Sequence, residues 1–352
     1  MVATFGRRSW IRLLMSARTL LFVGAMCPGL VLGHGCATTA TVDAQRSDGA
    51  FHVSPSGSDA YPGTEARPFR TLRKGVSVLS PGATLYVKSG TYAESLNNVI
   101  PGGRSWSEPV TVAAYPGHKV ILKPPVGSGF ALHFQGASQA YIVISGLTVD
   151  ASNVTYGAVK ITRGSPGDAA HHIRLIDSEI RDAPENGILT TGSAHSNEFI
   201  RLTVHSNGGV LKGRIQGYGF YLATDNNLVE ECDIYSNAKG GIQIYWRDGP
   251  VHGNVIRGSR VTGNGSGVIL TRGSRHLAYN NLIHGNERFG LKVDYGAKDA
   301  RVLNNTIYGN GLYGIYIGER SSGAVLRDNT VHSNGKNIRD LGRGTILGKT
   351  VE

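Results

Sequence analysis

The chain has 352 residues, of which 49 are glycine, and a formal net charge of +11. Glycine is about twice as frequent as usual, whereas charged residues make up 17% and hydrophobic residues 40%. This composition excludes a coiled coil, a helical bundle and a disordered chain, and the lack of a Gly-X-Y period excludes collagen. It favours a domain of many short strands and tight turns, large enough to bury a sizeable core.

The chain is still basic without residues 1–36, although those residues contain four arginines and no acid. Subtracting those four from the 36 basic residues leaves 32 against 25 acidic residues. A basic surface favours an acidic partner such as a uronate polysaccharide. The sequence has no arginine-rich run and no nucleic-acid-binding motif, so nucleic acid is not an expected partner.

Residues 1–36 have the features of an export signal. Arg7, Arg8 and Arg12 precede an apolar run, 19–32, that is too short and too interrupted to span a bilayer. The arginine pair is compatible with an ordinary secretory signal and with a twin-arginine signal. We therefore expect an exported protein that is periplasmic, anchored to the outer membrane by a lipid, or secreted.

The end of this signal leaves two cleavage sites open. Residues 32–36 resemble a bacterial lipoprotein cleavage site, after which a lipidated Cys36 would be the first residue of the mature chain. The alternative is ordinary cleavage near residues 42–44. Residues 37–50 are interpreted as a linker. A lipid on Cys36 is the only membrane contact expected, and Cys232 is expected to be buried and inert.

From about residue 185 the chain repeats a glycine-aliphatic-x-aliphatic unit. The last five glycines are 22, 26, 23 and 24 residues apart, which is too short for a propeller blade and fits one coil of three short strands. An aliphatic-x-x-asparagine unit follows each glycine unit. The asparagines are expected at equivalent turns, where their amides form a ladder from coil to coil. The repeat glycines are Gly187, Gly219, Gly241, Gly267, Gly290 and Gly314.

Strand alternation determines which side chains of each unit face inward. Aliphatic residues such as Ile242 are expected to fill a continuous apolar column, while residues such as Gln243 point outward. The two units recurring in phase resemble the repeat of right-handed parallel β-helix proteins over about 80–340. The predicted fold is therefore all-β: a right-handed parallel β-helix solenoid of about ten coils, with its repeats over 94–345.

Residues 51–93 are similar to the N-terminal segment of many secreted β-helix proteins, including polysaccharide lyases. The similarity rests on residues 51–64, 68–74 and 90–92. Within it, residues 71–79 have the pattern of a short amphipathic helix. We expect this helix to cover the open end of the solenoid, because terminal coils need a cap.

The outward positions of the glycine-aliphatic strands form one stripe along the solenoid. This stripe concentrates tyrosine, tryptophan and cations, which suit sugar rings and uronate carboxylates. The insertion at 208–217, which carries Lys212 and Arg214, is either a wall beside the stripe or a neutral surface loop. The alternative for the stripe itself is a solubilising face with a tyrosine ladder. The predicted substrate-binding residues are Gln243, Trp246, Arg247, Arg272, Tyr295 and Tyr316.

Two other faces are interpreted as structural. The strands that precede the asparagine units carry charges of alternating sign, which predicts a solvated surface with salt bridges. The members of this face are Arg174, Asp177, Glu198, Arg201, Glu230, Glu231, Arg257, Arg301, Arg327 and Asp328. A third stripe has one histidine or tyrosine ring in most coils. These rings do not form a local cluster with the spacing of metal ligands, so no metal site is predicted. Its members are His205, Tyr235, His284, Tyr308 and His332.

The β-helix resemblance implies the chemistry of pectate lyases, alginate lyases and mannuronan C5-epimerases. In these families a cation or calcium neutralises a uronate carboxylate, a base removes the C5 proton, and an acid protonates the leaving oxygen or the opposite ring face. Residues 218–220, Tyr-Gly-Phe, are similar to the epimerase active-site coil. The Asp-Pro-His-Asp that follows in epimerases is absent, because residues 221–224 are Tyr-Leu-Ala-Thr. Epimerase activity of that kind is therefore not expected.

If the protein is a lyase, the same stripe supplies its catalytic groups, with Arg247 and Arg272 holding carboxylates. Asp294 would orient a lysine or contribute to a calcium site. The cofactor is left open and calcium is not predicted, because no acidic cluster offers six to eight oxygens. The catalytic candidates are Lys292 and Lys160 as bases, Tyr221 and Tyr245 as proton donors, and Asp294.

The sequence thus predicts an exported monomer that acts on or binds acidic polysaccharide, and it leaves open whether β-elimination follows binding. The first alternative is a non-catalytic glycan-binding or structural surface protein. The second is a glycoside hydrolase that uses Asp294 and Glu319 as its carboxylate pair.

Overall fold

The computed structural model describes residues 49–351 apart from 212, 246 and 248. These residues belong to one compact unit, Arg46–Glu352. The export signal, Cys36, most of the 37–50 linker and Trp246 lie outside the described residues. No helix among the described residues is long and apolar enough to cross a membrane.

The described residues include one α-helix, α1 (Leu72–Ser77), within the predicted 71–79 segment. The Thr71 hydroxyl accepts the N–H of Lys74 at 3.1 Å, which caps the start of the helix. Leu72 and Val76 are fully buried and join the core of the first coil. The role of this helix as an end cap stays a prediction.

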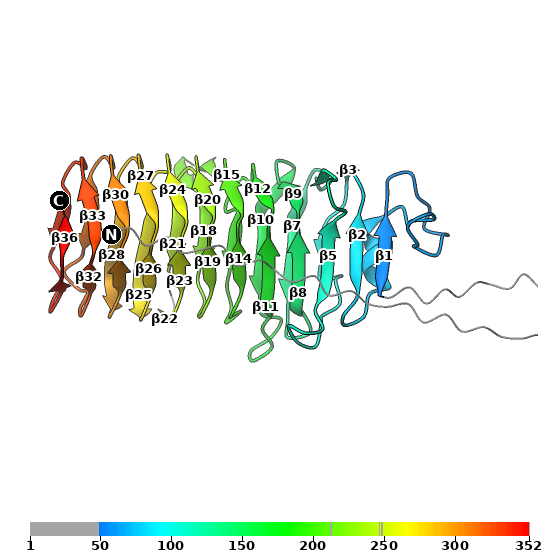
Figure 1. The fold of residues 1–352 in the computed structure, drawn as a ribbon, viewed down its shortest axis with the longest axis horizontal. Helices are drawn as coiled ribbons and strands as arrows, with labels where there is room; N and C mark the ends of the chain where they lie inside the picture. Colours follow the sequence, from blue (N-terminus) through cyan, green and yellow to red (C-terminus); the bar gives the residue numbers. More distant parts are fainter. Residues whose placement is uncertain (1–48, 212, 246, 248, 352) are drawn as a thin grey trace, which may run out of the picture. The chain divides into compact units, whose positions relative to one another are not determined.

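Three parallel sheets, here called A, B and C, form the sides of the solenoid, and each coil contributes a strand to each sheet. Figure 1 shows the strands lying side by side in chain order from β1 to β36. Sheet A contains β1 (Ala50–Val53), β2 (Thr84–Val87), β5 (Val110–Ala114), β8 (Ala140–Ser145), β11 (His171–Ile176), β14 (Glu198–Ile200), β19 (Leu228–Glu230), β23 (Val255–Arg257), β26 (Leu277–Tyr279), β29 (Arg301–Leu303), β32 (Val325–Arg327) and β35 (Ile346–Leu347).

Sheet B follows sheet A in each coil after a short turn. It contains β3 (Gly90–Tyr92), β6 (Val120–Leu122), β9 (Leu147–Asp150), β12 (Glu179–Arg181), β15 (Thr203–His205), β20 (Asp233–Tyr235), β24 (Arg260–Thr262), β27 (Leu282–His284), β30 (Thr306–Tyr308), β33 (Asn329–His332) and β36 (Thr350–Val351).

Sheet C holds the glycine-aliphatic units. It contains β4 (Leu96–Asn97), β7 (Ser128–Gln135), β10 (Val154–Thr162), β13 (Ile188–Thr190), β18 (Tyr218–Leu222), β21 (Gly240–Ile244), β25 (Val268–Ser274), β28 (Phe289–Lys298), β31 (Tyr313–Ile317) and β34 (Ile338–Asp340), with β22 (Val251–His252) beside the end of β25. The 208–217 insertion forms an antiparallel hairpin of β16 (Gly209–Leu211) and β17 (Arg214–Gln216).

The predicted alternation of side chains in sheet C is confirmed. The aliphatic residues of the repeat are completely buried and form one continuous core. Full burial of one such side chain stabilises the fold by roughly 1.5–3 kcal/mol. The pairs that face inward are Phe220 and Leu222, Ile242 and Ile244, Val268 and Leu270, Leu291 and Val293, and Ile315 and Ile317.

The predicted asparagine ladder is also present, at the turn from sheet B to sheet C. The side-chain amide of Asn237 donates to Oδ1 of Asn264 at 3.0 Å, and that of Asn264 donates to Oδ1 of Asn286 at 3.1 Å. Two further ladders, which the sequence analysis did not single out, run along the other turns. They consist of Asn197, Asn227 and Asn254, and of Asn281, Asn305 and Asn329.

The two faces interpreted as structural carry salt bridges on sheet A and stacked rings on sheet B. On sheet A, Arg174 pairs with Glu198 at 2.6 Å and Arg257 with Glu230 at 2.7 Å. On sheet B, neighbouring rings stack face to face, as His284 does on Tyr308 with centroids 4.8 Å apart. Cys232 is buried, as expected, and burial raises the pKa of its thiol to about 12.

Candidate functional site

The outward side chains of sheet C lie in one row that follows the solenoid axis. Strand register places each member directly beside the next: Lys160, Leu189, Tyr221, Gln243, Ile269, Lys292 and Tyr316. We call this set the outer row. Lys160 and Lys292 are five coils apart in it, so about 24 Å separates their strands at the spacing of ~4.8 Å per coil.

A groove of about 430 Å³ lies on the outer row at β21, β25 and β28. Gln243, Ile269 and Lys292 line it from the sheet, and Gln243 is only 7% exposed. Ile215 lines it from the β16–β17 hairpin, so the insertion borders the groove. The other lining residues are Tyr218, Ala238, Lys239, Gly265, Ser266, Glu287, Arg288, Phe289 and Tyr295.

The ammonium of Lys292 is held by one carboxylate and three aromatic rings. Its Nζ lies 2.7 Å from Oδ2 of Asp294, and both side chains are largely buried. The same Nζ lies 4.9 Å from the ring centre of Phe289, 5.3 Å from that of Tyr295 and 5.4 Å from that of Tyr316. A cation over ring faces is attracted by their negative quadrupoles. The carboxylate and the three rings therefore hold the ammonium of Lys292 in one position.

Local backbone geometry fixes the carboxylate partner of Lys292. Oδ1 of Asp294 accepts the backbone N–H of Tyr295 at 2.7 Å, and Tyr295 has a φ of 52°. This left-handed conformation is uncommon for an aromatic residue and turns the chain out of the regular strand. A Cβ on Gly318 would lie 2.0 Å from Oδ1 of Asp294, so the carboxylate occupies space that only glycine leaves open.

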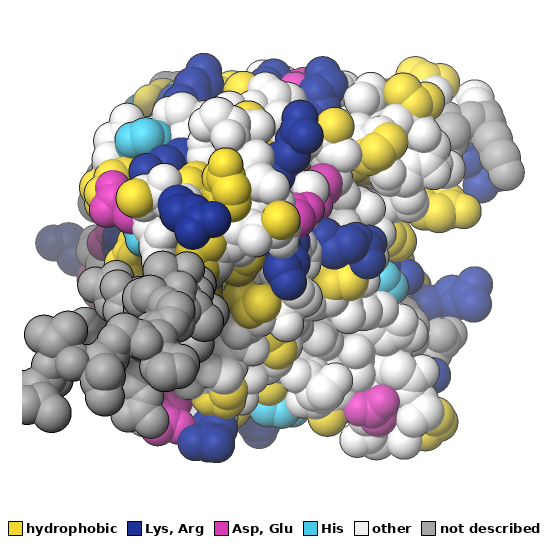
Figure 2. Space-filling view, turned by 90° about the vertical axis from the view of Figure 1, so that its right-hand side faces the viewer, with side chains coloured by type: hydrophobic (Ala, Val, Ile, Leu, Met, Phe, Trp, Pro, Cys, Tyr) yellow, Lys and Arg dark blue, Asp and Glu magenta, His cyan; other side chains and the backbone are white. Residues whose placement is uncertain are grey.

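The groove carries more positive than negative charge. Lys239, Arg288 and Lys292 line it, against one acidic lining residue, Glu287. Among the described residues, Lys239 and Arg288 form no ion pair, and they lie over the rings of Tyr218 and Phe289 at 5.4 Å each. Viewed from the β1 end, Lys and Arg side chains are spread over the surface and acidic ones are sparser (Figure 2).

The tyrosines beside the groove differ in their surroundings. The ring of Tyr221 lies 5.6 Å from that of Tyr218, and that of Tyr245 lies 6.2 Å from that of Tyr295. Burial, with a smaller contribution from Tyr245, raises the pKa of Tyr221 to about 12. Burial also raises the pKa of Tyr218. Tyr221 therefore keeps its proton at neutral pH and can act only as a proton donor there.

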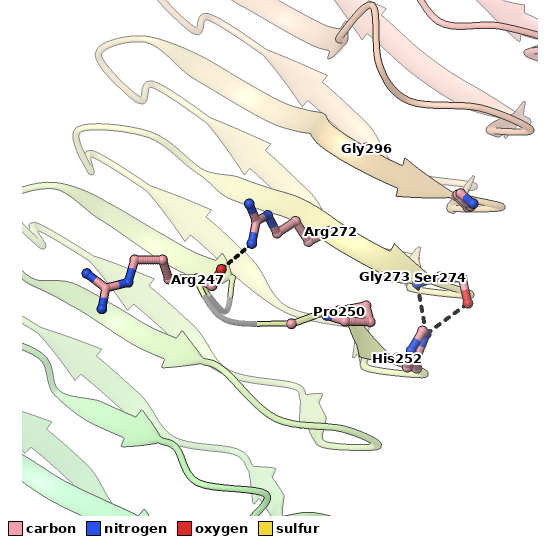
Figure 3. Close-up of a pocket in the computed structure, with 9 residues that line it drawn as sticks. Arg247, Pro250, His252, Arg272, Gly273, Ser274 and Gly296 are labelled. Atoms are coloured by element: carbon pink, nitrogen blue, oxygen red, sulfur yellow. Dashed lines mark hydrogen bonds between the residues drawn. The ribbon is translucent and has the colours of Figure 1, made fainter.

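Arg247 and Arg272 line a second pocket, of about 540 Å³, beyond the end of β21. Nη1 of Arg272 donates to the backbone carbonyl of Arg247 on one side of the pocket, and His252 and Ser274 lie together on the other side (Figure 3). The Arg272 guanidinium also lies over the ring of Tyr245 at 5.6 Å. Tyr245 therefore lies between this pocket and the exposed ring of Tyr295.

The structure brings some predicted residues together and separates others. Lys292, Asp294, Tyr295 and Tyr316 form one cluster, and Gln243 lines the same groove. Arg247 and Arg272 belong to the second pocket. Lys160 lies five coils away, over the ring of Phe130 at 5.2 Å.

Sequence reasoning missed several lining residues. Phe289 and Tyr218 directly precede a repeat glycine, a position outside the glycine-aliphatic unit itself. Aromatic residues recur there, which is the signal that could have found them: Tyr156, Tyr218, Phe289 and Tyr313. Within the described ranges no group of three or more His, Cys, Asp or Glu side chains is arranged to hold a metal ion.

Comparison with known proteins agrees with this architecture. The family described as "Right handed beta helix region" matches residues 186–349, and "Protein of unknown function (DUF1565)" matches residues 55–102. Pectate lyase PEL9 of Emericella nidulans is 24% identical over 217 residues, which cover 58% of this chain and 52% of that protein. The chain spans about half the length of the curated relatives it matches.

Two solved structures are similar at the level of the fold. The A-module of mannuronan C-5 epimerase AlgE4 from Azotobacter vinelandii has a TM-score of 0.56 at 20% identity, covering 72% of this chain and 70% of that one. Pectate lyase Pel9A has a TM-score of 0.56 at 17% identity, covering 81% and 79%. The three stacked parallel sheets and these matches lead to one conclusion: the chain has the fold of a right-handed parallel β-helix.

Proposed function

We propose that this protein binds acidic polysaccharide in the groove on sheet C, with Lys292 pairing with a uronate carboxylate. The observation that carries the proposal is the position of Lys292, with its ammonium among three rings at the edge of a groove. One Nζ–H points to Asp294, and the ammonium has two more to donate. The names of the similar proteins, a pectate lyase and a mannuronan epimerase, are consistent with a uronate ligand.

The residues around Lys292 suit the rest of a sugar chain. Tyr295 is 52% exposed, so its ring offers a face on which the apolar side of a sugar can stack. Lys239 and Arg288 add two cations on the same groove and can pair with neighbouring carboxylates. Binding of this kind weakens with salt, because the charges are partly solvated.

Affinity electrophoresis tests this binding. The purified protein is run through gels that contain polygalacturonate, alginate or uncharged dextran. We expect retardation in one or both acidic gels and none in dextran. The Lys292→Ala variant should lose at least tenfold in apparent affinity, since a charge-assisted hydrogen bond contributes about 1.5–3 kcal/mol. A matched control is Lys336→Ala, on an exposed lysine of the last coils. Equal retardation of all three proteins would contradict the proposal.

A lyase is the second candidate, because the half-buried Tyr221 carries a phenolic proton beside Gln243 of the same groove. In β-elimination a base takes the C5 proton, the C4–O bond breaks, and a donor such as Tyr221 protonates the leaving oxygen. Lys292 is the nearest candidate base, and its Nζ lies 2.7 Å from Oδ2 of Asp294. A base has to be unprotonated to take the C5 proton, so an elimination by Lys292 requires its neutral amine.

Ultraviolet absorbance of unsaturated uronate ends distinguishes the two candidates. A rise with wild type that is absent in Tyr221→Phe and in Lys292→Ala would establish a lyase at this site. Retardation in acidic gels without any rise, with and without calcium, would establish a binding protein that does not cleave.

A further inference from the structure

A second cluster of rings with one lysine lies on the outward side of sheet C, at β7 and β10. These strands are neighbours, and register places Lys160 directly beside His133 (Figure 1). The ring of Phe130 lies 5.6 Å from that of Tyr156 and 5.4 Å from that of His133. Nζ of Lys160 lies 5.2 Å from the centre of the Phe130 ring. The four side chains therefore form one patch, and the structure describes every residue of both strands.

Tyr156 is the member of this patch that a ligand can reach most easily. Its side chain is 50% exposed, whereas Phe130, His133 and Lys160 are half-buried. The Phe130 ring supports Tyr156 from the neighbouring strand, with 35° between the ring planes. An exposed ring that is held in this way offers an apolar surface on which the C–H side of a sugar can stack.

Lys160 supplies the charge of the patch. Among the described residues it forms no ion pair, unlike Lys292 with Asp294. Glu185 of the next coil donates its backbone N–H to the carbonyl of Tyr156 at 2.9 Å, and its carboxylate forms no ion pair with Lys160. Burial and the charge of Lys160 lower the pKa of His133, so this ring is neutral at neutral pH. The ammonium of Lys160 can therefore donate to the carboxylate of a sugar that stacks on the neighbouring ring.

The patch repeats part of the arrangement around Lys292. In both places a lysine of the outer row lies over a phenylalanine ring near an exposed tyrosine, and at the groove these rings are Phe289 and Tyr295. The strands of the two lysines are about 24 Å apart. One ring and one partly solvated ammonium bind weakly on their own. A chain that reaches both places gains affinity, because its second contact forms within a complex that already exists.

We propose that Phe130, Tyr156 and Lys160 form a distal subsite for the acidic polysaccharide, separate from the groove on sheet C. The inference rests on the proposed function for the identity of the polymer. The protein would then bind long uronate chains more tightly than short oligosaccharides, because only a long chain contacts the groove and the distal subsite together.

Two ligands of different length test the distal subsite. They are whichever of polygalacturonate and alginate retards wild type in gels, and a trisaccharide of the same uronate measured by titration calorimetry. We expect Tyr156→Ala and Lys160→Met each to weaken retardation by the polymer about threefold or more. Both variants should bind the trisaccharide within twofold of wild type, which also shows that they are folded. The controls are Tyr61→Ala, on a tyrosine that is 39% exposed outside sheet C, and Lys336→Met, and both should match wild type on the polymer.

The failures of the two proposals can be told apart. Losses on the polymer that do not exceed those of the two controls would overturn the distal subsite. Equal losses on the polymer and on the trisaccharide would overturn it as well, because the two residues would then belong to the site that the short ligand occupies. Losses confined to the polymer, together with unchanged binding of both ligands in Lys292→Ala, would overturn only the groove on sheet C. Wild-type protein that neither acidic polymer retards would overturn both proposals.

Discussion

Nζ of Lys292 and Oδ2 of Asp294 lie 2.7 Å apart on one strand, two residues from each other, at the border of the groove on sheet C. Both side chains point outward from β28, as the period of two dictates. The bulge at Tyr295 keeps the carboxylate in place by donating a backbone N–H to it. The pair holds a cation in position before any ligand arrives, and the same carboxylate repels an incoming uronate.

This relationship predicts the effect of Asp294→Asn. The amide keeps an oxygen for the Tyr295 N–H but removes the negative charge, so less repulsion opposes a uronate carboxylate. We expect the affinity for polygalacturonate to rise about two- to fivefold at low salt, and the difference to shrink as salt screens the charges. The measurement is the apparent affinity in gels at two ionic strengths. A lower affinity of Asp294→Asn would mean that orienting Lys292 matters more than the repulsion.

The asparagine ladder predicts a large loss of stability on substitution. Asn264 is buried, donates to Ile234 O and Asn286 Oδ1, and accepts from both nitrogens of Asn237. Asn264→Ala leaves buried partners without a hydrogen bond, which costs about 1–3 kcal/mol for each one. Urea unfolding should show a lower free energy of unfolding by at least about 2 kcal/mol.

Its control is Gln135→Ala, which removes an exposed side-chain amide that donates to the carbonyl of Arg163 at 3.3 Å. That change should lower the free energy of unfolding by less than about 1 kcal/mol. Similar losses in the two variants would contradict a structural role specific to the buried ladder.

His276 predicts how stability depends on pH. The side chain is fully buried beside the second pocket, its Nε2–H donates to the carbonyl of Arg272 at 3.2 Å, and burial lowers its pKa to about 4. The unfolded chain binds a proton at this residue near pH 6.5 and the folded chain only near pH 4, so stability rises with pH between these values. Between pH 6.5 and 4 the residue alone should cost about 3 kcal/mol.

His276→Gln isolates this contribution, because the glutamine amide can reach the same carbonyl but does not titrate. The free energy of unfolding of the variant should fall less steeply between pH 6.5 and 4 than that of wild type. Parallel curves for the two proteins would show that other groups, such as the partly buried His171 and His172, account for the whole slope.

The fold could be predicted because each coil of the solenoid corresponds to one copy of a repeat in the sequence. The in-phase glycine and asparagine units predict the three parallel sheets, the buried aliphatic pairs and the ladder at the turn from sheet B to sheet C. The other two ladders were missed because asparagine occupies their turn position in only some of the coils. At the position of Asn281, for example, the coil before has Ser259 and the coil before that has Cys232.

The site could be predicted only in part. Alternation placed Lys292 and Tyr316 in one row, and their proximity follows from register. The separation of Arg247 and Arg272 from Lys292 could not be foreseen, because it depends on the bulge in β28 after Asp294 and on the pairing of β22 with the end of β25. Phe289 contacts Lys292 from a position before the repeat glycine, where strand alternation gives no direction.

Isothermal titration of a uronate trisaccharide tests the central claim most directly, with wild type, Lys292→Met and Lys160→Met compared. Both lysines belong to the outer row, but only Lys292 has the groove beside it. The account predicts that Lys292→Met weakens binding at least tenfold, while Lys160→Met stays within twofold of wild type. Equal effects of the two substitutions, or binding that survives in Lys292→Met, would contradict the assignment of the site.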